Sequence, residues 1–384
     1  MKEFEYYMPV RLVFGRGKVS LTGRFAKGYG NKALLVTGKN SAKRTGLLER
    51  VIRCLEDEGM GYAVFDRIEE NPLTTIVEEG AAYATGQKCD VVVGLGGGSA
   101  IDAAKGIAFA AVNSGNISEY IFGKQGSGAL PLIAVTTTAG TGSEGDSLAV
   151  LTNPDTKDKK ALKSVHIYPK VSIVDPELMT TLPKRLIAPT GLDALCHAIE
   201  AFIAVRSNPV SDALALKAIE IISVNLPKVY DDPNDIEAWG NMALANTFGG
   251  MVIDSAGVAL AHGMEHSVSG LLNVRHGEGL AAILPHFMEY TYPMAVDKFS
   301  QIAKAMGQDT KKLTAGEAAI LCMEAVKKLL NRLGLNLTLG GLGVREEHAD
   351  WLAENSMKTM AYAIGNNPRV PDIDGIKDLY LRCL

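Results

Sequence analysis

The chain has 384 residues and a formal net charge of -4, and 47% of its residues are hydrophobic. This length exceeds one ordinary hydrophobic core and suits two domains. The near balance of charge, without a long run of Lys or Arg, argues against nucleic acid and anionic membranes as partners. No uninterrupted apolar stretch of about 18 residues occurs, so we expect no membrane span.

The N-terminus and the cysteines provide information about the cellular compartment. The N-terminus carries acidic residues and no apolar segment of the kind found in a secretory signal peptide. The five cysteines are scattered and form no CxxC pair. We therefore expect reduced thiols in a cytoplasmic enzyme, and we interpret Cys196, beside a candidate ligand, as a small buried hydrophobe.

The first half of the chain alternates strand-like and helix-like segments. We expect strands at residues 33–37, 62–65, 90–93, 131–135 and 171–174, and helices at 47–55 and 74–87. This alternation is typical of a parallel sheet covered by helices.

Beyond about Leu182 the strand signals become sparse and long helical patterns dominate, as at residues 211–224 and 316–333. The sequence therefore predicts an α/β domain at residues 1–182 and an all-helical domain at 183–384.

A glycine-rich loop follows the third expected strand. Residues 91–99 (VVVGLGGGS) run from the strand into glycines, and a helix begins directly afterwards. Glycines let the backbone approach a phosphate closely, and the free N–H groups at a helix start bind anions. The alternative is a tight turn without a ligand, but the loop lies at the carboxyl end of a strand, where open α/β sheets bind ligands. A hydroxyl-rich loop at 136–144 follows the next strand and is a weaker candidate.

The second half holds a cluster of possible metal ligands. Asp193 and His197 are four apart in a helical segment, so both side chains share one face. His262 and His266 repeat this spacing, and His276 follows ten residues later. A carboxylate with several imidazoles suits Fe²⁺ or Zn²⁺. A single such pair is more often a hydrogen bond on a helix surface, but two pairs and a further histidine favour a metal site.

Taken together, these motifs resemble the iron-containing (group III) alcohol dehydrogenase family over essentially the whole chain. The matching segments are GGGSxxD at residues 96–102, TTAGTGSE at 137–144, TGxDALxHAxE at 190–200, and HxMxH at 262–266 with the histidine at 276. The resemblance implies the dehydroquinate synthase-like fold of this family, with an α/β NAD(P)-binding domain, an all-α metal-binding domain and a cleft between them.

The resemblance also implies an activity and a set of site residues. The expected reaction is reversible hydride transfer between NAD(P) and a small-molecule primary alcohol or diol, or its aldehyde, in a homodimer. The implied metal ligands, for Fe²⁺ or alternatively Zn²⁺, are Asp193, His197, His262 and His276, with His266 as a catalytic or supporting residue. The candidate residues of the cofactor site are Gly38, Ser41, Asn71, Gly97, Gly98, Ser99, Asp102, Thr137, Thr138, Lys160, Leu178 and Leu182.

Three departures from the family pattern bear on specificity. The first long strand ends at Gly38, where many NAD-using relatives have an aspartate that would repel a 2′-phosphate, and residues 39–44 are basic. This predicts a preference for NADP. Ser267 replaces the usual proline, and Gly145-Asp146 replaces the usual Val-Thr. Both changes bear more on the substrate than on the chemistry.

Three other functions are compatible with parts of this pattern. A dehydroquinate synthase-like enzyme would need several basic residues for a phosphate-bearing substrate, and residues 255–280 supply only Arg275. A glycerol-dehydrogenase-like enzyme would differ mainly in substrate and metal. A catalytically inactive binding or assembly protein would not require the intact ligand set.

Overall fold

The computed structural model describes residues 3–384, which form two compact units. One unit is Met8–Leu182, and the other contains Pro183–Leu384 together with residues 3–7. The described residues before Met8 therefore group with the helical unit and not with the α/β unit that they precede in the sequence.

The α/β unit is organised around a six-stranded sheet in the order β1-β8-β5-β4-β2-β3, in which every pairing is parallel. Its strands are β1 (Arg11–Phe14), β2 (Lys32–Gly38), β3 (Gly61–Ile68), β4 (Val91–Gly96), β5 (Leu132–Thr136) and β8 (Val171–Val174). The predicted parallel sheet and its five expected strands are confirmed. The sequence missed β1, which is short and partly exposed and carries no continuous apolar run.

A two-stranded antiparallel sheet of β6 (Leu148–Thr152) and β7 (Lys159–Lys163) also belongs to this unit and was not predicted. The lysines of β7 hide its strand pattern. Short helical turns complete the unit: η1 (Lys18–Leu21), η2 (Ser143–Gly145), η3 (Val165–Ile167) and α7 (Pro176–Met179).

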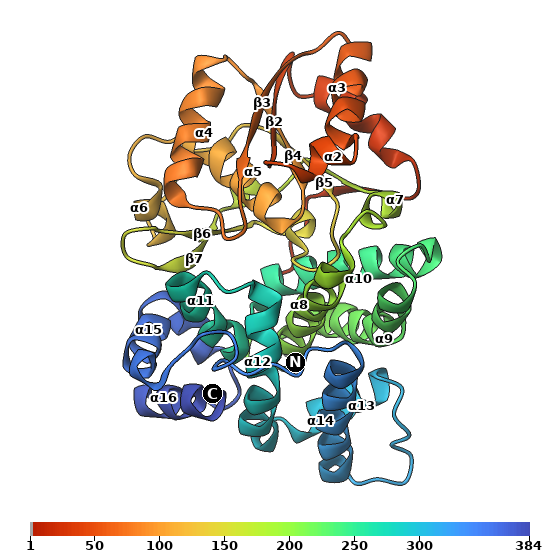
Figure 1. Ribbon diagram of the computed structural model, residues 1–384, viewed down its shortest axis with the longest axis vertical. Helices are drawn as coiled ribbons and strands as arrows, with labels where there is room; N and C mark the ends of the chain where they lie inside the picture. Colours follow the sequence, from red (N-terminus) through yellow and green to blue (C-terminus); the bar gives the residue numbers. More distant parts are fainter. Residues whose placement is uncertain (1–2) are drawn as a thin grey trace. The chain divides into compact units, whose positions relative to one another are not determined.

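Alternation along each strand divides the core of the α/β unit between two faces of the sheet. Leu34 and Val36 pack on one face and Ala33 and Leu35 on the other, so both faces are apolar. The first face is covered by α4 (Thr74–Gly86), α5 (Gly98–Ala110) and α6 (Ile117–Ile121), and the second by α1 (Thr22–Lys27), α2 (Ser41–Arg44) and α3 (Leu47–Asp57) (Figure 1). Because all six strands are parallel, their carboxyl ends share one edge of the sheet.

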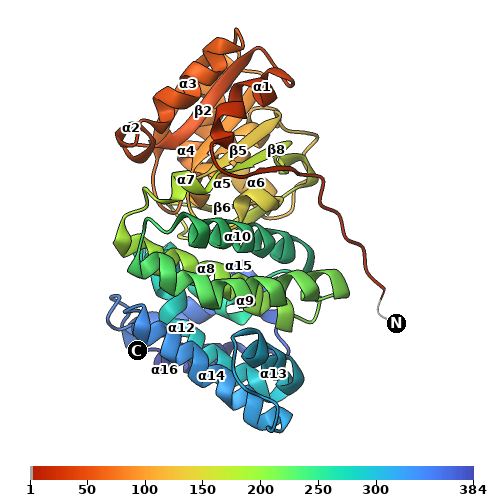
Figure 2. The ribbon, with the colours of Figure 1, turned by 90° about the vertical axis from the view of Figure 1, so that its right-hand side faces the viewer.

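Residues 183–384 form helices and no strand, which confirms the predicted all-helical region. The helices are α8 (Lys184–Ile203), α9 (Pro209–Asp231), α10 (Ile236–Ala256), α11 (Leu260–Leu272), α12 (His276–Thr291), α13 (Val296–Ala305), α14 (Ala315–Arg332), α15 (Ala349–Gly365) and α16 (Ile373–Arg382), with the turns η4 (Tyr292–Met294) and η5 (Glu346–His348). Figure 2 shows α8, α9 and α10 lying side by side.

The helical unit contains a long apolar helix and a sharp bend. By length and composition α8 is apolar enough to cross a membrane, but 89% of that stretch is buried inside the structure, as expected of a core helix. Between α10 and α11 the chain bends by 102°. Gly257, with φ 78°, ends α10 in a backbone conformation that other residues rarely adopt.

Candidate metal centre and cofactor loops

Three of the four predicted ligands, all histidines, converge on a carboxylate oxygen of the fourth, Asp193. Asp193 and His197 lie on α8, His262 lies on α11, and His276 is the first residue of α12. The Nε2 atoms of His197 and His262 each lie 3.5 Å from Asp193 Oδ1, and that of His276 lies 3.6 Å away. The fold therefore brings together residues that are far apart in the sequence.

Two further buried carboxylates orient the imidazoles. His262 Nδ1 bonds to Glu200, and His276 Nδ1 bonds to Glu265. A carboxylate at Nδ1 holds the proton on that nitrogen and directs the Nε2 lone pair at the opposite side of the ring, as in metal-binding histidines generally. Both Nε2 atoms are consequently presented to the space beside Asp193.

The ligand atoms of Asp193, His262 and His276 all lie within 4.8 Å of one another and fit a divalent cation, and His197 adds a nitrogen 3.5 Å from Asp193 Oδ1. Two ligand atoms each about 2.1 Å from a tetrahedral cation lie about 3.4 Å apart, close to the separations measured from Asp193 Oδ1. Asp193 Oδ1 and His262 Nε2 are buried and make no hydrogen bond to any of residues 3–384, which is costly unless another partner is bound. Asp193, Glu200 and Glu265 also place three carboxylates in one buried region, and a cation would offset that charge.

Mutual electrostatics shift the pKa values of Asp193 and His262 strongly. Burial alone would raise the pKa of Asp193, but the adjacent imidazoles lower it to about 2. Burial alone would lower the pKa of His262, but Glu200 and Asp193 raise it to about 10. In the absence of a cation, the proton on His262 therefore compensates part of the buried negative charge.

The local fold explains how α11 and α12 reach α8. Glu200 Oε1 accepts hydrogen bonds from the backbone N–H groups of Ala259 (2.9 Å) and His262 (3.2 Å), so it caps the start of α11 while its other oxygen bonds the His262 ring. Gly277 lies so close to α8 that a Cβ there would be 2.0 Å from the Pro189 carbonyl oxygen. The absence of a side chain at Gly277 therefore allows His276 to approach Asp193.

His266 lies beside this cluster and is not one of the three histidines around Asp193. Its ring centroid is 6.2 Å from that of His262 and 5.6 Å from that of His276, and it is buried. Cys196 is fully buried, and burial raises the pKa of its thiol well above the ordinary value. This agrees with the interpretation of Cys196 as an inert hydrophobe.

Sequence reasoning missed the roles of Glu200, Glu265 and Gly277. The two glutamates stood within the matched motifs, but they were not assigned a function. A usable signal was present, because metal-binding histidines almost always donate their second ring nitrogen to a carboxylate or carbonyl. No comparable signal marks Gly277, whose importance depends on the approach of a distant helix.

The predicted cofactor residues of the α/β unit gather at the carboxyl edge of the parallel sheet. Gly38 ends β2, residues 97–99 follow β4, residues 137–138 follow β5, and residues 178 and 182 follow β8. Ligands of open α/β sheets bind at this edge. The glycine loop and the hydroxyl loop also touch, since a Cβ on Gly97 would lie 3.0 Å from the Thr138 side chain.

The remaining predicted cofactor residues occupy varied surroundings. Asn71 follows β3 with φ 51°, and Ser41 begins α2 next to Gly38. Lys160 on β7 lies over the Phe122 ring, and burial lowers its pKa. Asp102 accepts hydrogen bonds from Ser143 Oγ and the Val150 N–H, so both of its oxygens are engaged within the protein.

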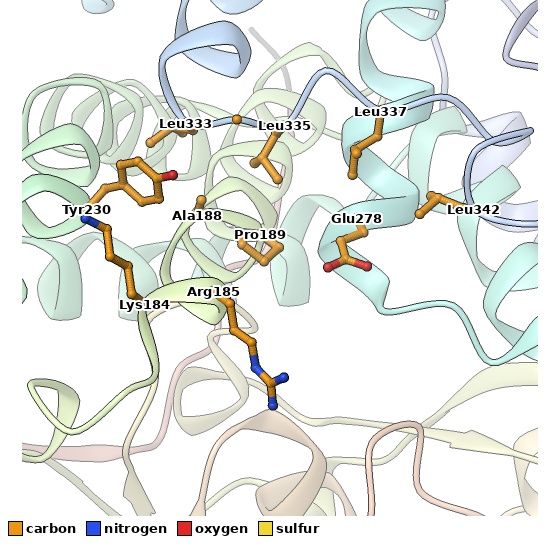
Figure 3. Close-up of a pocket in the computed structure, with 11 residues that line it drawn as sticks. Lys184, Arg185, Ala188, Pro189, Tyr230, Glu278, Leu333, Leu335, Leu337 and Leu342 are labelled. Atoms are coloured by element: carbon orange, nitrogen blue, oxygen red, sulfur yellow. The ribbon is translucent and has the colours of Figure 1, made fainter.

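A separate hollow of about 410 Å³ lies in the helical unit at the first turns of α8. Figure 3 shows leucines of residues 333–342 along one side and Lys184 and Arg185 on the other. Pro189 and Glu278 also line it, but none of the four converging ligands does. This hollow is therefore distinct from the candidate metal centre.

Comparisons with known proteins match both halves of the chain to one family. A model described as the iron-containing alcohol dehydrogenase matches residues 9–176, and one described as the C-terminal part of the Fe-containing alcohol dehydrogenase family matches residues 187–384. The chain is 35% identical over 384 residues to the NAD-dependent methanol dehydrogenase of Bacillus methanolicus, covering 99% of each chain. It is 38% identical over 358 residues to the 1,3-propanediol dehydrogenase of Klebsiella pneumoniae, covering 92% of each. The crystal structure of an archaeal alcohol dehydrogenase from a Red Sea brine pool superposes with a TM-score of 0.94 at 36% identity, covering 100% of both chains.

Proposed function

The chain belongs to the iron-containing alcohol dehydrogenase family, and we propose that it oxidises primary alcohols or diols reversibly at a bound divalent metal. It is an oxidoreductase acting on CH–OH groups, and the matching family models favour this activity over the dehydroquinate synthase-like alternative. The observation that carries the metal proposal is the convergence of three imidazole Nε2 atoms on Asp193 Oδ1. The proposed ligands are Asp193, His197, His262 and His276, and the proposed metal is Fe²⁺, with Zn²⁺ as the alternative.

Each unit has a proposed part in the reaction. Residues 183–384 would hold the metal, whose Lewis acidity makes an alcohol hydroxyl easier to deprotonate. Glu200 and Glu265 keep the His262 and His276 rings in the tautomer that presents Nε2. Residues 8–182 would bind the dinucleotide, with the N–H groups at the start of α5 on its pyrophosphate. His266, buried beside the ligands, is proposed to move the alcohol proton towards solvent.

Activity assays test this function directly. Protein reconstituted with Fe²⁺ or with Zn²⁺ is mixed with a panel of short alcohols, diols and aldehydes, and the absorbance of the reduced cofactor is followed. We expect turnover with at least one substrate class and its loss on chelation or in His262→Ala. Full activity in metal-free protein would rule out the proposed role of the metal.

A finer proposal concerns the dinucleotide. Gly38 carries no acid that would repel a 2′-phosphate, which supports NADP. Two of the nearby cations are already paired, Lys39 with Glu69 and Lys43 with Asp66, and such exposed pairs are weak enough to be exchanged for a phosphate. Arg44, which lies with Lys43 in α2, is also exposed. The methanol dehydrogenase relative is NAD-dependent by name, so the preference needs a direct test.

Gly38→Asp provides that test. A Cβ at Gly38 would lie 3.4 Å from the Ile68 carbonyl oxygen and 3.8 Å from Ser41 Oγ, so the position accepts a side chain. We expect kcat/KM with NADPH to exceed that with NADH in the unchanged protein, and the ratio to fall in the variant because the carboxylate repels the 2′-phosphate. A strong NADH advantage in the unchanged protein would reject the NADP proposal. The homodimer and the cytoplasmic location stay predictions from the sequence.

A further inference from the structure

A buried ion pair joins α5, the helix that begins at the glycine loop, to the segment after the hydroxyl loop. Lys105 Nζ lies 2.5 Å from Asp146 Oδ1, with the two side chains 0% and 3% exposed. The same ammonium donates to the Leu148 carbonyl at 2.8 Å, and Asp146 Oδ1 accepts the Leu148 N–H at 2.8 Å. Both charges are thus fixed by directional bonds to one short stretch of backbone.

A second attachment lies one helical turn earlier on α5. Asp102 accepts a hydrogen bond from Ser143 Oγ at 2.5 Å and another from the Val150 N–H at 3.0 Å. Asp102 and Lys105 are three residues apart, so they lie on the same face of the helix. Together they hold residues 143–150 against the first two turns of α5.

The two loops above these attachments interlock. A Cβ on Gly98 would lie 2.2 Å from Thr141 Cγ2, so the hydroxyl loop packs directly on the first residue of α5. The near end of the hydroxyl loop is fixed by β5, which ends at Thr136. Its far end, after Gly142, is fixed where residues 143–150 meet α5. The ion pair therefore helps to set how the hydroxyls lie over the helix N-terminus.

We propose that Asp146 is a positioning residue for the dinucleotide. It acts through Lys105 and Leu148, which hold the hydroxyl loop in register with the N-terminus of α5. This inference rests on the proposed function, because it assumes that these two loops bind the cofactor. Asp146 is one of the two residues that stand where the family motif usually has Val-Thr.

Asp146→Asn tests the inference with little change of shape. Asparagine can still accept one hydrogen bond, but it removes the carboxylate charge that the buried Lys105 ammonium contacts, which weakens the attachment. We expect the Kd values for NADPH and NADH, measured by fluorescence titration of the metal-free protein, to rise about tenfold, the equivalent of one well-placed polar contact. An unchanged Kd would overturn the inference.

Asp90→Asn is the matched control for lost stability. The Asp90 carboxylate also accepts backbone N–H bonds, from Asn31 and Lys32, but at the amino ends of β2 and β4. Ligands bind at the opposite edge of such a sheet. We therefore expect a lower Tm with unchanged dinucleotide Kd, whereas a Kd shift equal to that of Asp146→Asn would show a general effect of destabilisation and overturn the inference.

A double variant separates positioning from folding. Lys105→Met with Asp146→Leu removes both buried charges, and such replacements often restore stability. We expect Tm to recover while the Kd values stay raised, since the bonds to Leu148 are still missing. Recovery of both would overturn the inference. If the unchanged protein binds neither dinucleotide, the proposed function fails as well, so the two failures are distinguishable.

Discussion

The candidate metal centre and the proposed cofactor loops, called the metal centre and the cofactor loops below, are built from different parts of the chain. The metal centre depends on side chains of particular types, brought from α8, α11 and α12 to one carboxylate. The cofactor loops depend on backbone, at glycines such as Gly97 and Gly98 whose contribution is to leave room. We therefore expect the first site to fail on single changes of chemistry, and the second to fail on added bulk.

The largest effect is expected at Gly277, where the approach of His276 to Asp193 depends on the absence of a side chain. In Gly277→Ala the added Cβ would lie 2.0 Å from the Pro189 carbonyl oxygen, so α12 must move away from α8. We expect the purified protein to lose its metal and the free energy of unfolding to fall by about 1–3 kcal/mol. Metal analysis and denaturant unfolding measure both.

Gly316→Ala is the control for this change. Gly316 lies in the first turn of α14, and a Cβ there would meet nothing within 4 Å. The same substitution should therefore stabilise the protein by up to about 1 kcal/mol, because alanine favours a helix over glycine. A Gly277→Ala protein with a full complement of metal would show that the close approach of the two helices is dispensable.

The next largest effect is expected for Glu200→Gln, which changes the hydrogen bonding of the side chain but hardly its shape. Glu200→Gln can still accept the N–H groups of Ala259 and His262, so α11 keeps its cap. Its amide nitrogen, however, donates to His262 Nδ1 and forces the proton onto Nε2, the proposed ligand atom. We expect the metal affinity to fall about 10–100-fold, measured by competition with a chromophoric chelator.

Two comparisons make the Glu200→Gln result specific. Glu265→Gln should weaken metal binding similarly through His276. Glu289→Gln on α12, which alters an exposed pair with Lys327 of α14, should leave the affinity unchanged. Equal affinities in all three variants would contradict the assigned role of the buried glutamates.

These differences explain which parts of the fold and of the two candidate sites could be predicted from the sequence. The residues around Asp193 were predictable because few other functions require an acid and three histidines in such motifs. The parallel strands were predictable from continuous apolar runs. Strand β1 and the β6–β7 hairpin were not, since their burial comes from tertiary contacts that local pattern does not encode. Gly277 was hidden for the same reason, because its neighbour Pro189 is distant in the sequence.

A smaller effect is expected for the dependence of metal affinity on pH. In the metal-free protein burial opposes protonation of His262, but Glu200 and Asp193 raise its pKa to about 10, while the pKa of Asp193 is about 2. A cation must therefore displace the proton of His262 but none from Asp193. We expect the metal affinity to fall by about tenfold for each unit of pH decrease below that pKa, measured by chelator competition.

The raised pKa of His262 also determines how the stability of the metal-free protein changes with pH. Protonated His262 contributes stability that is fully present below about 6.5, the ordinary pKa of histidine, and that is lost as pH rises through about 10. Denaturant unfolding of metal-free protein should show this decline, and metal-loaded protein should not. A metal affinity independent of pH would mean that His262 is already neutral when the cation arrives.

The smallest effect is expected at a side chain of the backbone-built site. Ser99→Ala removes one hydroxyl from the first turn of α5 but leaves the N–H groups of the helix start in place. Losing one hydrogen bond costs about 0.5–1.5 kcal/mol, so the dinucleotide Kd should rise by about tenfold at most. Gly98→Ala should cost far more, because its Cβ would lie 2.2 Å from Thr141 Cγ2 and separate the two loops. If fluorescence titration showed the reverse order, the pyrophosphate would be held mainly by side chains, and the contrast between the two sites would not hold.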